Sequence, residues 1–164
     1  MSERGNWANA YARQANADFH TWSMLQLDNA VPDCHKLLLL QMTCEKLTKA
    51  YLCSQGSDPR NLQSSHAYVA KNLPKIICHE MLTSGANPLR MTQAAKHLAQ
   101  EIELLAPAVK RGGQRLDNCE YPWEDHAGKL HVPLDWSFTT SNLLTAPAGR
   151  TFLKLVHGAI LRLL

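Results

Sequence analysis

The stretch Gln41–Leu52 (QMTCEKLTKAYL) belongs to a leucine-rich segment that decides how this chain folds. Apolar side chains recur through the segment at alternating steps of three and four residues, which places them on one face of a helix. These side chains are Leu37, Leu40, Cys44, Leu47 and Tyr51. Pro32 and Asp33 suit a helix start, and Gly56 suits a helix end. The pattern therefore predicts a helix from about residue 32 to just before residue 56.

The segment that precedes it, from about Asn6 to Asp28, predicts a second amphipathic helix. Its apolar side chains follow the same three- and four-residue steps: Ala8, Ala12, Ala15, Phe19, Trp22 and Leu25. Asp28, Asn29 and Pro32 interrupt the pattern. Because only a few residues connect the two helices, we expect them to pack as an antiparallel pair.

Further helical segments are predicted at about residues 66–71, 74–82, 88–106 and 150–164. Ser64 and Ser65 can cap the first of these, and Pro74 suits the first turn of the second. We therefore expect residues 1–164 to form one all-α domain, an antiparallel helical bundle of about five helices.

Residues 110–147 have a different character and predict an irregular insertion before the last helix. Within it, apolar residues alternate strictly with polar residues or proline, a period of two that is typical of strands: Leu130, Val132, Leu134, Trp136 and Phe138. Tyr121 and Trp123 alternate upstream, and the residues from Asp125 to Gly128 can turn the chain. We expect a small β-hairpin or extended arm that packs on the bundle or on a partner chain.

Composition excludes several classes of protein. The chain has 164 residues, of which 45% are hydrophobic and 19% charged, so it is neither disordered nor fibrous. Its net charge of +3 is compatible with an anionic partner and does not imply one. The longest purely aliphatic run is Leu37–Leu40, too short to span a membrane, and no signal peptide is recognisable. Five cysteines without a Cys-x-x-Cys spacing predict a reducing cytoplasm.

Glu45 and Lys49 stand four residues apart in the order that favours an ion pair along a helix. On physical grounds alone, the simplest interpretation is an exposed pair that stabilises the helix by a few tenths of a kcal/mol.

The pattern Gln-x-x-x-Glu-Lys-x-x-Lys-Ala-Tyr-Leu that begins at Gln41 resembles HEPN domains (higher eukaryote and prokaryote nucleotide-binding). The resemblance covers Ala8 to about Leu73, and Ser65-His66 stands where such domains have a Ser/Thr-His segment. It implies a helical bundle that often dimerises, in toxin–antitoxin or defence systems or beside a minimal nucleotidyltransferase. The arm is not part of the family's core pattern.

Many HEPN domains are metal-independent ribonucleases with an Arg-x(4–6)-His motif, and two places in this chain match that spacing. Arg60 and His66 have five residues between them, with Asn61 as in the commoner variant. Arg150 and His157 have six between them, on the late helix where the family usually carries the motif.

Both places also have simpler explanations. Arg60 can be an exposed loop residue, and His66 a histidine at a helix start that packs against Tyr51 or Leu73. In the second motif, Thr151 replaces the usual Asn and Ala159 the Tyr that often follows His-Gly. A separation of seven residues is almost two helical turns, so Arg150, Lys154 and His157 lie on one face of the helix. This face can simply be a solvated basic stripe.

The chemistry of such a site would need only proton transfer and charge stabilisation, because RNA carries its own nucleophile in the 2′-hydroxyl. A histidine can accept or donate the proton, and an arginine can hold the phosphate. One histidine per chain is little for both roles, which favours a site shared across a two-fold dimer.

Three functions stay open at this point. The favoured one is a HEPN-like domain, probable homodimer, that binds RNA, a nucleotide or a nucleotidyltransferase partner without catalysis of its own. The alternatives are a dimeric ribonuclease of the toxin or defence type and a structural assembly module that uses the arm. The resemblance and the charges suggest these binding residues: Glu45, Lys46, Lys49, Lys71, Lys75 and Lys154.

No metal or other cofactor is expected. The adjacent pairs Cys34-His35 and Cys78-His79 would point about 100° apart on a helix, so neither pair can bind one ion. Cys119, His126 and His131 supply only three ligands in a turn-rich segment, which makes a zinc site there improbable.

Overall fold

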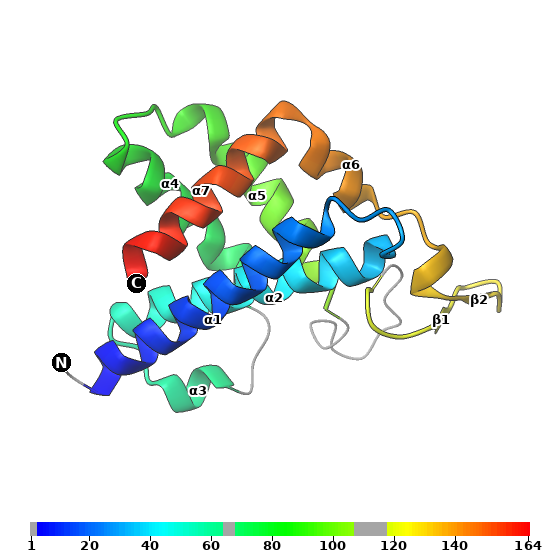
Figure 1. Ribbon diagram of the computed structural model, residues 1–164, viewed down its shortest axis with the longest axis horizontal. Helices are drawn as coiled ribbons and strands as arrows, with labels where there is room; N and C mark the ends of the chain where they lie inside the picture. Colours follow the sequence, from blue (N-terminus) through cyan, green and yellow to red (C-terminus); the bar gives the residue numbers. More distant parts are fainter. Residues whose placement is uncertain (1–2, 64–67, 107–117) are drawn as a thin grey trace.

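The chain folds as a helical bundle with a small hairpin beside it, as a computed structural model shows (Figure 1). The structure describes residues 3–63, 68–106 and 118–164. Within these residues the elements are α1 (Glu3–Leu25), α2 (Asp33–Ser54), α3 (Pro59–Gln63), α4 (Val69–Thr83), α5 (Leu89–Leu104), β1 (Trp123–Glu124), β2 (Leu130–His131), the 3₁₀ turn η2 (Pro133–Asp135), α6 (Thr139–Thr145) and α7 (Pro147–Leu163). The predicted all-α class, with a hairpin before the last helix, is confirmed.

Helices α1 and α2 form the expected antiparallel pair and lie side by side along most of their length (Figure 1). Three alanines of α1 are buried at this contact, and their small side chains let the two helices approach closely: Ala8, Ala12 and Ala15. Between the helices, the Asp28 side chain accepts a hydrogen bond of 2.8 Å from the Ala30 amide. The chain reverses there, and Pro32 precedes the first turn of α2.

Helix α2 lies at the centre of the bundle and carries the predicted apolar stripe into the main core. Leu37, Leu40, Cys44 and Leu47 are all at most 2% exposed. Helices α4, α5 and α7 complete this core with Leu73, Ile77, Ile102, Phe152 and Val156, among others. The core therefore buries one stripe of each long helix, which is the arrangement that the spacing of apolar residues predicted.

Two predicted helix boundaries are wrong. The segments at 66–71 and 74–82 belong in part to one helix, α4, which begins at Val69 and contains Pro74 in its interior. A proline there removes one backbone hydrogen bond. The first turn of α4 is stabilised by a residue of α5. The Ala70 amide, which has no partner within its own helix, donates a hydrogen bond of 2.7 Å to the Glu103 carboxylate. The short helix α3 lies earlier, at Pro59–Gln63, and residues 64–66 lie outside the described part.

The insertion also differs from its predicted form. Its last part is helix α6, and its strand β2 is only two residues long, because Pro133 lacks the amide that would continue the strand and starts η2 instead. Residues 110–117 of the predicted insertion lie outside the described part. The turn at Asp125–Gly128 is confirmed, with Gly128 at a φ of 80°. We refer to residues 118–138 as the arm.

An aromatic cluster and one carboxylate hold the hairpin of the arm together. The His131 ring stacks on Trp123, with ring centroids 5.7 Å apart, and meets Trp136 edge-on at 5.1 Å. Asp125 Oδ1 accepts hydrogen bonds from the amides of Ala127 and Lys129 at 2.9 and 3.0 Å. Its Oδ2 lies 2.8 Å from His131 Nε2. Asp125 thus closes the turn and orients the imidazole at the same time.

Acidification is expected to loosen this hairpin. The hydrogen bond from His131, with help from the two amides, lowers the pKa of Asp125 to about 2. Because the pKa is lowered in the folded state, the carboxylate stabilises the arm fully above its ordinary pKa of about 4, and this contribution disappears as the pH falls towards 2. The Gly128 amide and the Trp123 indole should report the loss in NMR spectra recorded between pH 5 and pH 2.

The matched control is Asp125→Asn, which keeps an acceptor for the turn amides and removes the titrating group. In this variant the two NMR signals should change much less between pH 5 and pH 2 than in the wild type, with only the effect of the neighbouring Glu124 carboxylate left. Wild-type signals that stay constant down to pH 2 would contradict the role assigned to Asp125.

Candidate functional site

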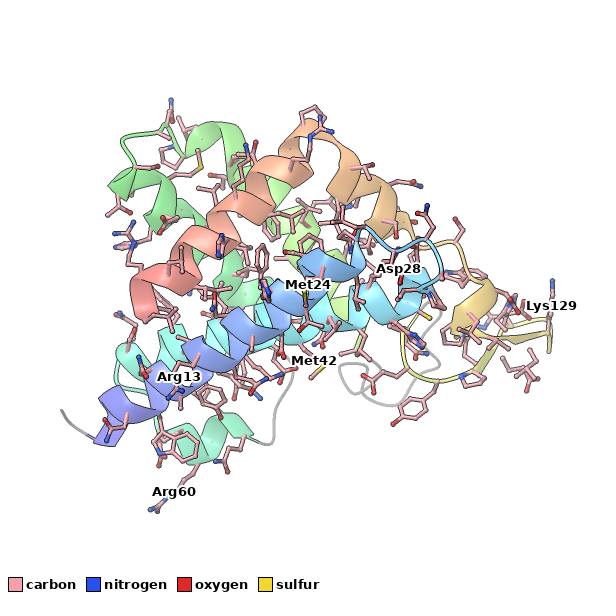
Figure 2. All side chains as sticks on the ribbon, in the orientation of Figure 1. Arg13, Met24, Asp28, Met42, Arg60 and Lys129 are labelled. Atoms are coloured by element: carbon pink, nitrogen blue, oxygen red, sulfur yellow. The ribbon has the colours of Figure 1, made fainter. Side chains whose placement is uncertain are left out.

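A large hollow among the described residues lies beside α2, on the side that Met42 marks in Figure 2. Its volume is about 760 Å³, and we call it the α2 cleft. Side chains from α2, α3, the residues just after α5 and the arm line it: Leu38, Gln41, Met42, Glu45, Lys46, Lys49, Gln63, Ala106, Glu120 and Tyr121. Five of these, at positions 41, 42, 45, 46 and 49, come from the stretch Gln41–Leu52.

Three polar side chains form a ladder along the wall of the α2 cleft. Gln41 Nε2 donates to Glu45 Oε2 at 3.1 Å, and Lys49 Nζ donates to Glu45 Oε1 at 2.7 Å. The steps of four residues stack the three side chains on one face of α2. Gln41, Glu45 and Lys49 are only 2%, 8% and 4% exposed. The interpretation as an exposed ion pair is therefore wrong, because both side chains of the pair are buried although they border the α2 cleft.

A second ion pair joins α2 to α1 near the ladder. Lys46 Nζ donates to Asp18 Oδ2, and Asp18 Oδ1 accepts a further hydrogen bond of 2.9 Å from Gln14 Nε2. Asp18 is buried, whereas Lys46 is partly exposed and lines the α2 cleft. The pair therefore fixes the position of the Lys46 ammonium at the cleft from the side of α1.

The cysteines near this region are poor nucleophiles. Cys44 is completely buried on α2, and burial raises the pKa of its thiol to about 12. Burial also raises the pKa values of the Cys34 and Cys53 thiols. Because the thiolate is the reactive form, these three side chains act as small apolar residues at neutral pH.

The candidate catalytic residues of α7 line two different hollows. Arg150 is exposed and lines a cleft with Trp22 and Lys36. His157, two turns further along α7, stacks on Phe19 of α1, with ring centroids 4.9 Å apart and an angle of 10° between the rings. Lys154 is exposed between them. The three side chains are thus on the outside of α7, but no hollow among the described residues joins Arg150 with His157.

The remaining predicted site residues lie away from the α2 cleft. Arg60 is exposed on α3, and its predicted partner His66 lies outside the described residues. Lys71 and Lys75 are exposed on α4, where Lys75 Nζ donates to Asn72 Oδ1 at 3.4 Å. Of the six predicted binding residues, the structure therefore brings together only those at positions 45, 46 and 49.

Some residues of the site escaped the sequence analysis. Asp18 is 28 positions away from Lys46, and nothing in the local pattern connects the two. Tyr121 and Glu120 of the arm reach the α2 cleft only because the arm returns to the bundle. For Gln41 the sequence does contain a signal, because it stands four residues before Glu45 in the pattern Gln-x-x-x-Glu-Lys.

Two general properties of the described residues bear on function. No three His, Cys, Asp or Glu side chains come together there as possible metal ligands. None of the helices in the same part of the chain is both long and apolar enough to cross a membrane.

The resemblance to HEPN domains stays a prediction, carried by the pattern from Gln41 to Leu52 on α2. Comparisons with family models, curated proteins and solved structures test it no further. None of the three gives a match to this chain.

Proposed function

We propose that this chain is a binding domain without catalysis of its own, and that it takes a nucleotide or a short segment of RNA in the α2 cleft. The ladder of Gln41, Glu45 and Lys49 carries this proposal. Polar groups are costly to bury unless they are hydrogen-bonded, as these three are to one another. The row forms part of the wall of the α2 cleft, where it places polar groups beside a hollow large enough for a small ligand.

The side chains around the ladder suit the parts of a nucleotide. Tyr121 is 61% exposed at the edge of the cleft, where its ring can stack on a base. The amides of Gln41 and Gln63 can donate to and accept from the edge of a base. The Lys46 ammonium, held in place by Asp18, lies at the cleft, where it can also contact a phosphate. Leu38 and Met42 form an apolar surface beside these groups.

The same residues argue against catalysis at this place. The described lining of the α2 cleft includes no histidine, cysteine or serine, and its Glu45 and Lys49 side chains are hydrogen-bonded to each other. That the chain has a nucleotidyltransferase-type partner, and that it is located in the cytoplasm, are predictions from the sequence that these observations do not address.

Titration of a fluorescein-labelled oligoribonucleotide, followed by fluorescence anisotropy, tests the proposal. Replacing Tyr121 by alanine should weaken binding by about tenfold, because stacking of one base on an aromatic ring accounts for about that much affinity. Tyr121 is exposed, so the variant should fold normally. The labelled RNA should also remain uncut when it is recovered on a gel after the titration.

Lys96→Gln serves as the control, because Lys96 is an exposed lysine on α5 outside the α2 cleft. It should bind the RNA almost as the wild type does. Absence of binding, or an equal loss in the Lys96→Gln and Tyr121→Ala variants, would refute the α2 cleft as the binding site. Cleavage of the RNA would refute the non-catalytic assignment.

A further inference from the structure

The hairpin of the arm has two different faces. Trp123 is opposite His131 and Glu124 is opposite Leu130 in the β1–β2 register, and opposite residues project from the same side of a hairpin. The Trp123–His131 side packs against Trp136. The other side presents Glu124 and Leu130 to solvent, with Leu130 68% exposed.

The structure holds this outer face firmly in place. The turn at Asp125 is closed by four hydrogen bonds: two to its side chain, one of 2.9 Å from Asp125 N to Lys129 O, and one of 3.0 Å from Gly128 N to Asp125 O. Lys129, at the tip, projects away from the helices (Figure 2). A partner that covered Leu130 would gain hydrophobic free energy, and a preorganised arm loses little conformational freedom when it docks.

A hollow of matching character lies at the junction of α1, α2, α6 and α7, and we call it the junction cleft. Its volume is about 400 Å³. Its apolar lining consists of Trp22, Leu37, Leu144 and Leu153. Lys36 and Arg150 add two positive charges, and Asp33 adds one negative charge while it accepts a hydrogen bond of 3.1 Å from Ser141. Such a hollow can bind an apolar side chain that has a carboxylate beside it.

We propose that the outer face of the arm docks into the junction cleft of a second copy of this chain. Leu130 then covers the apolar lining, and the Glu124 carboxylate meets Arg150 and Lys36. The charges of the two surfaces are complementary over a wider area. Residues 118–138 contain four acidic side chains and one lysine, whereas the first half of α7 contains Arg150 and Lys154 and no acidic side chain.

The positions of the two surfaces favour a closed dimer. The arm lies at the same end of the bundle as α6 and the start of α2, where the junction cleft is (Figure 1). A two-fold axis near this end would let each copy give its arm to the other and receive one in return. Such a reciprocal contact closes after two copies, whereas a one-way contact would build open chains.

Sedimentation velocity over a range of protein concentrations tests the association. The expected result is a reversible dimer of the 18.3 kDa chain whose dissociation constant rises with salt concentration, since charge pairs contribute to the contact. Leu130→Ser should weaken the dimer by about tenfold or more. A monomer at every concentration would overturn the proposal, and so would a dimer that Leu130→Ser leaves unchanged.

Charge reversal identifies which two surfaces meet. Glu124→Arg and Arg150→Glu should each abolish or strongly weaken the dimer, because each places like charges opposite one another. When the two variants are mixed, every arm meets a cleft of opposite charge, so a heterodimer should form. Two weakened variants that fail to associate on mixing would overturn the pairing of the arm with the junction cleft.

A matched control comes from another exposed leucine. Leu89, at the start of α5, is 81% exposed and lies outside both the arm and the junction cleft. Leu89→Ser should leave the dissociation constant unchanged. A loss of the dimer in this variant would place the interface elsewhere and refute the proposal.

Discussion

Replacement of Glu45 by alanine is expected to lower the free energy of unfolding by about 3 kcal/mol. An exposed pair with the same spacing would contribute only a few tenths of a kcal/mol. The difference arises from burial, because Lys49 is 4% exposed and its ammonium donates to Glu45 at 2.7 Å. Without the carboxylate, this positive charge stays in a place that water barely reaches. Urea denaturation followed by circular dichroism measures the loss.

A double variant separates the buried charge from other effects of the substitution. Glu45→Ala combined with Lys49→Met removes both charges and leaves an apolar stem of similar length. It should recover much of the stability that the single variant loses, because no charge is then left without its partner. A loss below about 1 kcal/mol in the single variant would mean that water in the α2 cleft solvates the pair as it does at a surface.

Gly149→Ala is expected to destabilise the protein by about 2 to 3 kcal/mol, although the same exchange inside a helix ordinarily stabilises by up to about 1 kcal/mol. Gly149 lies in the first turn of α7, directly against the end of α6. A Cβ atom there would lie 2.2 Å from the Leu143 carbonyl oxygen and 2.6 Å from the Leu144 Cα. Both contacts are with backbone, which cannot rotate away, so α6 and α7 would have to separate. Thermal unfolding would show the effect as a lower Tm.

Gly158, in the same helix, provides the comparison. A Cβ at this position would lie 2.7 Å from Glu80 Oε1, which is the end of a flexible side chain. The Glu80 carboxylate also receives two hydrogen bonds from Arg162, at 2.9 and 3.1 Å, and it can shift with that partner. Gly158→Ala should therefore change the free energy of unfolding by less than about 1 kcal/mol. If Gly149→Ala were equally mild, the tight contact between α6 and α7 would be contradicted.

The long helices could be predicted from local pattern alone. The stripes on α1, α2, α5 and α7 each repeat at helical spacing, and a helix of that length must bury such a stripe to be stable. The hairpin turn was equally local, because Asp125 and Gly128 are residues that turns favour. The start of α4 could not be predicted in this way. It depends on Glu103, which lies 33 positions away and completes the first turn from α5.

In the candidate site, too, some features follow from the local sequence pattern and others depend on long-range packing. The spacing of Gln41, Glu45 and Lys49 by itself determined that these side chains would contact one another, because residues four apart are neighbours on any helix. Only the tertiary structure decided that they would be buried, and that Asp18 of α1 would hold Lys46 beside them. Burial depends on which parts of the chain pack against a helix face, and a local sequence pattern does not contain that information. The sequence therefore determined the ladder, and packing turned it from a surface ion pair into the wall of a cleft.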